Sequence, residues 1–147
     1  MKLYLDTSAL VKFFHVEEGT RNVHDLVENS ENEIFISELA KIEFYCALYR
    51  RFRNKEIEKE NLERALEGFE AQINDFQVER LGRAVIREAE KLIKSSAPYH
   101  GLRTLDALQL ATYSLISEKD WYFVSTDKPL NDIATEKGFN VINPLES

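Results

Sequence analysis

The chain has 147 residues, of which 44% are hydrophobic and 31% charged, and its formal net charge is −7. This balance is typical of a water-soluble protein with one hydrophobic core, so we expect one domain spanning residues 1–147. No apolar stretch approaches the ~18 residues of a membrane span, and the single cysteine excludes an intrachain disulfide, so we expect a cytoplasmic protein without membrane association.

The first predicted strand covers residues 3–5 and stops at Asp6, and a helix is predicted over residues 9–14. Asp6 therefore lies at the tip of a strand, directly ahead of a helix. In open α/β sheets this edge is where ligands bind. Asp is also a preferred N-cap residue, so for Asp6 alone a helix cap is the favoured explanation, and the case for a ligand site depends on the other acids.

The next segment predicts a short helix, a second strand and a long helix. Thr20 is the expected N-cap of the short helix, which ends near residue 30. The strand covers residues 33–36, and Ser37 is the expected N-cap of a helix over residues 38–52.

Glu43 lies on this long helix within a mostly apolar stripe that includes Leu39 and Ala47 at helical spacing. A carboxylate in such a setting is costly unless it is paired or binds a metal. The alternative is a Glu at the edge of the stripe that pairs with Lys41 or Arg50 in solvent.

The same helix ends in a basic cluster interleaved with aromatic residues, Arg50, Arg51 and Arg53 among them. Such a cluster could hold phosphates, but basic residues also suit the last turn of any helix. An amphipathic helix over residues 58–74 follows, and the two helices are predicted to form a hairpin around Asn54.

A third strand is predicted over residues 76–78, followed by a helix over residues 82–94 and a loop that contains Pro98 and Gly101. The next helix is expected to begin near Thr104, which places Asp106 in its first turn. An acid there complements the helix dipole, and it could also point at the edge of the sheet.

A strand is predicted over residues 120–125, Thr126 and Asp127 follow its end, and Pro129 lies at the start of another helix. Asp127 thus repeats the arrangement of Asp6. A last strand covers residues 139–142. Because strands and helices alternate, the sequence predicts an α/β fold with a mainly parallel sheet of about five strands and helices on both faces.

Four acids are thereby predicted to converge at one edge of the sheet: Asp6, Glu43, Asp106 and Asp127. Carboxylate oxygens are the ligands that hard divalent cations prefer. The three histidines, His15, His24 and His100, have no ligand-like spacing, so we interpret them as surface or satisfied residues. The acidic net charge argues mildly against nucleic acid binding, although bound cations would offset part of it.

Four segments resemble the motifs of PIN domains, in order and across nearly the whole chain. The first is Leu5-Asp6-Thr7-Ser8-Ala9-Leu10, and the second contains Ser37, Leu39 and Glu43. The third is the run from Leu102 to Ala111, which contains Asp106, and the fourth is Ser125-Thr126-Asp127. The length of the chain resembles the VapC-like toxins of VapBC-type toxin–antitoxin pairs.

This resemblance implies a PIN-like fold and a toxin endoribonuclease that uses Mg²⁺ or Mn²⁺. It also implies an RNA substrate, a small antitoxin protein as partner and a homodimer. By the same resemblance Asp6, Glu43, Asp106 and Asp127 are the catalytic and metal-binding acids. The expected substrate-binding residues are Ser8, Arg50, Arg51, Arg53 and Arg103. Gln109 stands where PIN domains commonly have His, and Ser125 stands where they commonly have Thr.

Two other functions are kept as alternatives. A phosphatase with an aspartyl nucleophile also begins with a strand that ends in Asp followed by Thr, but such enzymes carry a second Asp two residues later, where this chain has Ser8. A non-catalytic or regulatory PIN-like scaffold that binds RNA would carry the same acids as caps.

Overall fold

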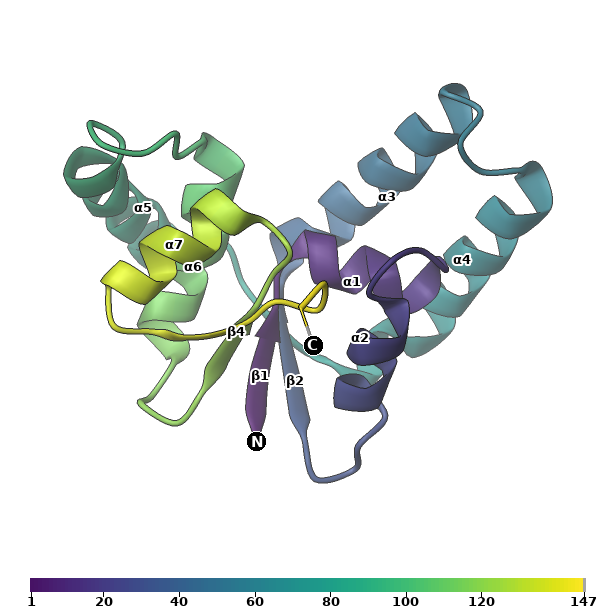
Figure 1. Cartoon of the computed structure of the whole chain (residues 1–147), viewed down its shortest axis with the longest axis horizontal. Helices are drawn as coiled ribbons and strands as arrows, with labels where there is room; N and C mark the ends of the chain where they lie inside the picture. Colours follow the sequence, from purple (N-terminus) through teal and green to yellow (C-terminus); the bar gives the residue numbers. More distant parts are fainter. Residues whose placement is uncertain (147) are drawn as a thin grey trace.

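The structure is a computed structural model that describes residues 1–146, and it contains a parallel sheet with helices on both faces (Figure 1). The strands are β1 (Lys2–Leu5), β2 (Glu33–Ser37), β3 (Gln77–Glu79), β4 (Tyr122–Val124) and β5 (Asn140–Ile142). The helices are α1 (Thr7–Phe14), α2 (Thr20–Val27), α3 (Glu38–Arg53), α4 (Lys59–Gln72), α5 (Arg83–Ser96), α6 (Thr104–Ile116) and α7 (Lys128–Glu136). A 3₁₀ turn (Ile73–Asp75) follows α4. The predicted α/β class, five strands and two helical layers are confirmed.

The strand order is β3-β2-β1-β4-β5, and every neighbouring pair is parallel. The chain builds outward from β1 to β3 and then returns to the other side of β1 with β4. The direction of winding therefore reverses between β1 and β4. In open parallel sheets, a crevice opens at such a reversal beyond the carboxyl ends of the two strands.

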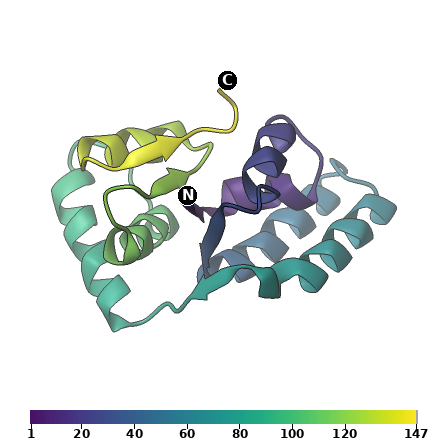
Figure 2. The same ribbon diagram turned by 90° about the horizontal axis from the view of Figure 1, so that it is seen from below.

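Alternate residues of the strands pack into two separate cores, one on each face of the sheet. Leu3 and Leu5 of β1 pack with α1 to α4, whereas Tyr4 packs with α5, α6 and α7. This division follows from the two-residue period of side chains along a strand. Figure 2, seen from below, shows the same separation of the two helical groups.

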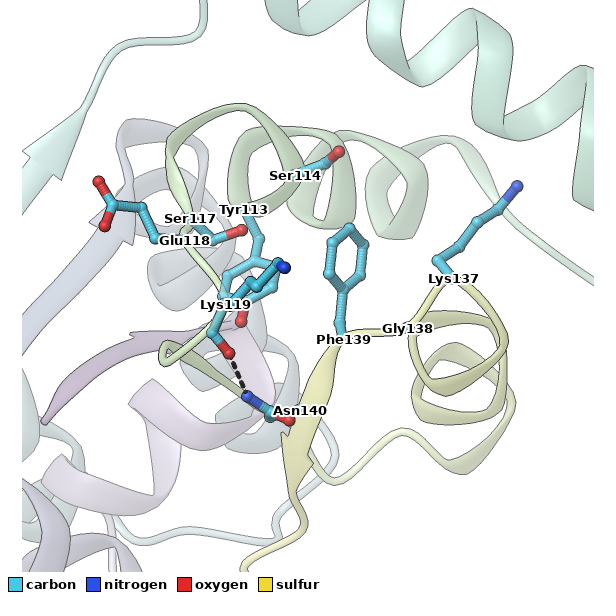
Figure 3. Close-up of a pocket in the computed structure, with 9 residues that line it drawn as sticks. All are labelled: Tyr113, Ser114, Ser117, Glu118, Lys119, Lys137, Gly138, Phe139 and Asn140. Atoms are coloured by element: carbon cyan, nitrogen blue, oxygen red, sulfur yellow. Dashed lines mark hydrogen bonds between the residues drawn. The ribbon is translucent and has the colours of Figure 1, made fainter.

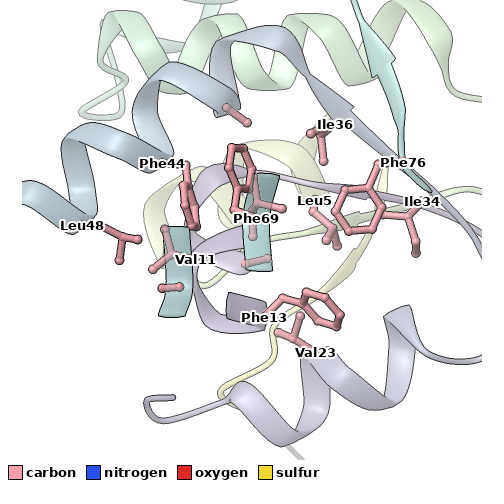
Figure 4. Close-up of a cluster of buried hydrophobic side chains, with 14 of the residues drawn as sticks. Leu5, Val11, Phe13, Val23, Ile34, Ile36, Phe44, Leu48, Phe69 and Phe76 are labelled. Carbon is pink, nitrogen blue, oxygen red and sulfur yellow. The ribbon is translucent and has the colours of Figure 1, made fainter. Parts of the chain in front are cut away.

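The core that supports α3 is rich in aromatic residues (Figure 4). Phe44 of α3 stacks on Phe69 of α4, with ring centroids 4.0 Å apart, and Phe14 of α1 meets both rings edge-on. Such pairs are each worth about 0.5–1.5 kcal/mol beyond their buried area. The packing confirms the predicted hairpin of α3 and α4 and holds α3 against α1.

One predicted cap is wrong. Thr20 is the first residue of α2, and Gly19 precedes it with a φ of 91°. Glycine adopts that left-handed conformation without steric cost. Gly19 is therefore the N-cap residue of α2, and no side chain caps the helix. The Thr20 hydroxyl instead accepts a hydrogen bond from the backbone N–H of Glu17.

Candidate metal-binding and active site

Asp6 lies at the end of β1, where both of its carboxylate oxygens are occupied. Oδ1 accepts hydrogen bonds from the backbone N–H of Ala9 at 3.1 Å and from the Ser8 hydroxyl at 2.6 Å. Oδ2 accepts one from the Ser125 hydroxyl at 2.6 Å. The bond from Ala9 makes Asp6 the N-cap of α1, which confirms the predicted cap. The hydrogen bonds from the two serines hold the Asp6 carboxylate in addition to this cap.

The two serines join Asp6 to the turn after β4. The Ser8 hydroxyl accepts a hydrogen bond from the backbone N–H of Thr126, and the Ser125 hydroxyl accepts one from that of Asp127, both at 3.0 Å. Each hydroxyl thus gives its one hydrogen to the carboxylate and receives one from the backbone. The ends of β1 and β4 are therefore bridged through one carboxylate.

Burial raises the pKa of Asp6 to about 6, because a carboxylate with 5% of its surface exposed loses most of its hydration. The hydrogen bonds from Ser125, Ser8 and Ala9 oppose this rise, whereas the charge of Asp127 adds to it. The carboxyl is held in place but is poorly compensated as an anion. A cation beside it would remove that penalty.

Asp127 caps α7 through Oδ1, which accepts a hydrogen bond from the backbone N–H of Leu130 at 3.0 Å. Among the interactions within residues 1–146, this is the one hydrogen bond that its side chain accepts. Its other oxygen accepts none of those hydrogen bonds.

Glu43 is held in a comparable way. Its Oε1 accepts hydrogen bonds from the Thr7 hydroxyl and from the side-chain amide of Gln109, each at 2.8 Å. The solvent pairing with Lys41 or Arg50 is not found within the part of the chain that the structure describes. The helical period explains the orientation, because Phe44 faces the core and the preceding residue is turned about 100° away from it.

Asp106 lies in the first turn of α6, as predicted, and is partly buried. Its pKa is raised by burial and then by the charges of Asp127 and Glu43, while Arg103, whose Nε is 3.6 Å from Oδ2, opposes the rise. The repulsion shows that these three carboxylates share one electrostatic environment.

All four acids line one cavity of about 670 Å³ at the β1–β4 reversal. Ser8, Arg50, Arg51 and Arg103 line it too, whereas Arg53 is not among its lining residues. Arg51 is tethered by Glu17, whose Oε2 is 3.4 Å from its Nη2, and Lys12 holds the other oxygen of Glu17 at 3.1 Å. The cavity thus combines an acidic floor with basic side chains.

The donor set suits Mg²⁺ or Mn²⁺, since it consists of carboxylate oxygens backed by hydroxyls. Burial raises the pKa of both Asp6 and Asp106. Within residues 1–146, however, no three His, Cys, Asp or Glu side chains stand close enough together to hold a metal ion as they are. Binding would therefore require side-chain rotations that bring the acids inward.

A smaller hollow of about 240 Å³ lies at the far end of α6 (Figure 3). The Asn140 amide there donates to the backbone carbonyls of Lys119 and Trp121, so it is already used in holding the start of β5 to the turn that precedes β4. Burial raises the pKa of Tyr113 to about 12, which keeps its hydroxyl neutral. The hollow therefore offers no group of acids comparable to the one at the β1–β4 reversal.

Three polar contacts to the acids come from residues that were not predicted as part of the site. Thr7 and Gln109 contact Glu43, and Ser125 contacts Asp6. Gln109 and Ser125 are the two departures from the PIN motifs, and both touch carboxylates. Gln109 lies one helical turn after Asp106, and that spacing was the signal that could have revealed it.

None of the helices in residues 1–146 is long and apolar enough to cross a membrane. A comparison with curated proteins found no match.

Solved structures of similar fold cover nearly the whole chain. FitAcB from Neisseria gonorrhoeae has 17% sequence identity and a TM-score of 0.71, with 99% of each chain covered. VapBC2 from Rickettsia felis, bound to a DNA fragment from its promoter, has 18% identity and a TM-score of 0.64, covering 97% of this chain and 98% of that one. VapC20 from Mycobacterium tuberculosis, described as a toxin that cleaves the sarcin–ricin loop, has 15% identity and a TM-score of 0.67, covering 93% and 95%. At these identities the likeness concerns the fold.

The sequence itself matches the PIN domain family over residues 3–135, a stretch that contains all four acids. This chain therefore belongs to the PIN domain family.

Proposed function

We propose that this protein is an endoribonuclease that depends on Mg²⁺ or Mn²⁺ and acts as the toxin of a type II toxin–antitoxin pair. The observation that carries the proposal is that four carboxylates line one cavity at the β1–β4 reversal of a PIN domain. A bound divalent cation supplies Lewis acidity, which activates water and neutralises charge on the attacked phosphate.

The residues of the chain would divide the remaining work. Asp6 is held by Ser8 and Ser125, so it offers a fixed anionic centre to the cation. Glu43, Asp106 and Asp127 would complete the ligand set. Arg50 and Arg51 lie on the α3 wall of the cavity, where they could bind the phosphates that flank the cleaved bond and keep the RNA backbone over the acids.

A small antitoxin protein and a second copy of the chain are the proposed partners. FitAcB and VapBC2 are structures of similar fold, and another is described as a toxin–antitoxin complex from Klebsiella pneumoniae. An antitoxin segment that entered the cavity could pair with Arg50, Arg51 or the acids. The proposal thus assigns the same cavity to substrate and inhibitor.

The test is cleavage of single-stranded and loop RNA by the purified protein. The wild type should cleave with Mg²⁺ or Mn²⁺ and stop in excess EDTA. Asp6→Asn should abolish cleavage while circular dichroism remains unchanged. Asp25→Asn, a matched change at an exposed position of α2, should cleave like the wild type.

Cleavage that continues in EDTA or in Asp6→Asn would contradict the metal-dependent mechanism. A folded wild type that binds RNA and cleaves none of a varied pool with either cation would favour the non-catalytic scaffold. Membership of the PIN domain family argues against the phosphatase alternative.

A further inference from the structure

Gln109 is a buried polar residue in the middle of α6, with 3% of its surface exposed. It lies on the same helical face as Asp106, so its amide points toward the edge of the sheet where the acids gather. A buried amide is costly unless its donors and its acceptor are all satisfied. Its partners therefore indicate its role.

Each hydrogen-bonding group of the Gln109 amide has a partner. Its Oε1 accepts a hydrogen bond from the Tyr4 hydroxyl at 2.7 Å. Its Nε2 donates to Oε1 of Glu43 at 2.8 Å and to the Thr7 hydroxyl at 3.1 Å. Thr7 in turn donates to the same Glu43 oxygen. Gln109 thus lies between a residue of the core and a candidate metal ligand.

The partners also fix which way the amide points. Tyr4 is fully buried, and burial raises the pKa of its hydroxyl, so it remains a hydrogen-bond donor. A reversed amide would turn the Gln109 oxygen toward the Glu43 carboxylate, two acceptors facing each other. The observed orientation is the one that places an N–H donor on Glu43.

We propose that Gln109 is a positioning residue: it anchors Oε1 of Glu43 with Thr7 and leaves Oε2 as the oxygen available to a cation in the cavity. This inference rests on the proposed function and names the residue that prepares one ligand of that site. A partner that orients a metal-binding side chain typically changes metal affinity or turnover 10- to 100-fold when it is removed.

The competing explanation is that Gln109 only satisfies the buried Tyr4 hydroxyl. Removing Gln109 alone cannot separate the two, because it leaves that hydroxyl without its acceptor and could unfold the core. The double variant Tyr4→Phe/Gln109→Leu removes both partners, which is close to neutral for stability when the shapes are similar. It leaves Glu43 without its amide anchor in a protein that still folds.

The experiment measures Mn²⁺ affinity by calorimetry and RNA cleavage at saturating Mn²⁺, using wild type, the double variant, Gln109→His and Gln77→Leu. We expect the double variant to bind Mn²⁺ about 10- to 100-fold more weakly and to lose kcat while its KM for RNA stays unchanged. Gln109→His should recover most of the affinity, since one ring nitrogen can accept from Tyr4 and the other can donate to Glu43. Gln77→Leu, an exposed change on β3, should match the wild type.

A double variant with wild-type Mn²⁺ affinity and kcat would overturn the positioning role, and so would a Gln109→His variant as weak as the double variant. If the wild type binds no Mn²⁺ at millimolar concentration, the positioning role and the metal site fall together. If it binds Mn²⁺ in a Gln109-dependent way but cleaves no RNA, the proposed function alone falls.

Discussion

Two strand–helix junctions, β1–α1 and β4–α7, lie side by side at the centre of the sheet and are built on the same plan. In each, a strand ends at an Asp that caps the following helix: Asp6 accepts from the N–H of Ala9, and Asp127 accepts from that of Leu130. Both side chains line the same cavity. Each Asp therefore caps a helix and also faces the cavity.

The junctions differ in how completely each carboxylate is held. Asp6 is buried and receives hydrogen bonds on both oxygens, whereas Asp127 is partly exposed and receives one on Oδ1. Moreover, the Ser125 hydroxyl that holds Asp6 belongs to the second junction. The hydrogen bonds therefore hold Asp6 more firmly than Asp127, and under the proposed function Asp127 would be the acid that moves toward a cation.

The largest expected effect concerns the pH dependence of stability without metal, and it belongs to Asp6. The pKa of Asp6 is about 6 in the folded protein, against an ordinary value of 3.8. The stability contributed by its protonated form is fully present below about pH 4 and is lost as the pH rises through about 6. The shift corresponds to roughly 3 kcal/mol of unfolding free energy.

Urea unfolding in EDTA from pH 4 to pH 7 measures this loss. Asp6→Asn should lack the corresponding fall, while Asp127→Asn should keep most of it, since the charge of Asp127 is the smallest of the causes that act on Asp6. Parallel profiles for wild type and Asp6→Asn would show that the titration of Asp6 does not cause the loss of stability.

The next effect comes from the contact that joins the two junctions. Ser125→Ala removes a buried hydroxyl that donates to Asp6 and accepts from the N–H of Asp127. Leaving such groups unsatisfied costs about 1–3 kcal/mol, measured by urea unfolding in EDTA at neutral pH. Ser30→Ala, at an exposed site, should stay within about 0.5 kcal/mol of wild type. Equal costs for the two serines would mean that the bridge contributes nothing.

The sequence was sufficient to predict where the two junctions meet. Asp6 and Asp127 each follow an apolar run that reads as a strand, and the carboxyl ends of parallel strands lie at one edge of a sheet. The same reasoning brought Asp106 to that edge from the first turn of a helix. These predictions needed only local pattern and one rule of topology.

The contacts that hold the acids were beyond such reasoning. The bond from Gln109 to Glu43 spans 66 residues, and the bond from Ser125 to Asp6 spans 119, so neither has a local signal. Arg53 is a residue that local reasoning placed in the site and that does not line the cavity. It follows the helical spacing of Arg50, but Arg50 and Arg51 line the cavity and Arg53 does not, so the cavity ends within the last turn of α3. Helical spacing predicts which face of α3 a residue lies on, but it does not predict how far along the helix the cavity extends.

The smallest expected effect tests whether the second junction is a ligand as well as a cap. Asn caps helices about as well as Asp, so Asp127→Asn should keep α7 intact, whereas Asp127→Ala should cost about 1 kcal/mol. The charge of Asp127 raises the pKa of both Asp6 and Asp106, which means that it repels their anionic forms. Removing that charge should therefore raise the melting temperature in EDTA slightly above that of the wild type.

If Asp127 is a ligand, Mg²⁺ reverses the order of the melting temperatures of wild type and Asp127→Asn. A cation that binds the folded protein and not the unfolded chain stabilises it, so the wild type should gain melting temperature with millimolar Mg²⁺. Asp127→Asn should lose most of that gain and fall below the wild type, and the thermal melts with and without Mg²⁺ should cross. A residue that only caps α7 gives no crossing, because Mg²⁺ would then shift both proteins equally or not at all. Melting curves that shift equally with Mg²⁺ would assign the cation to the other acids and leave Asp127 as a cap.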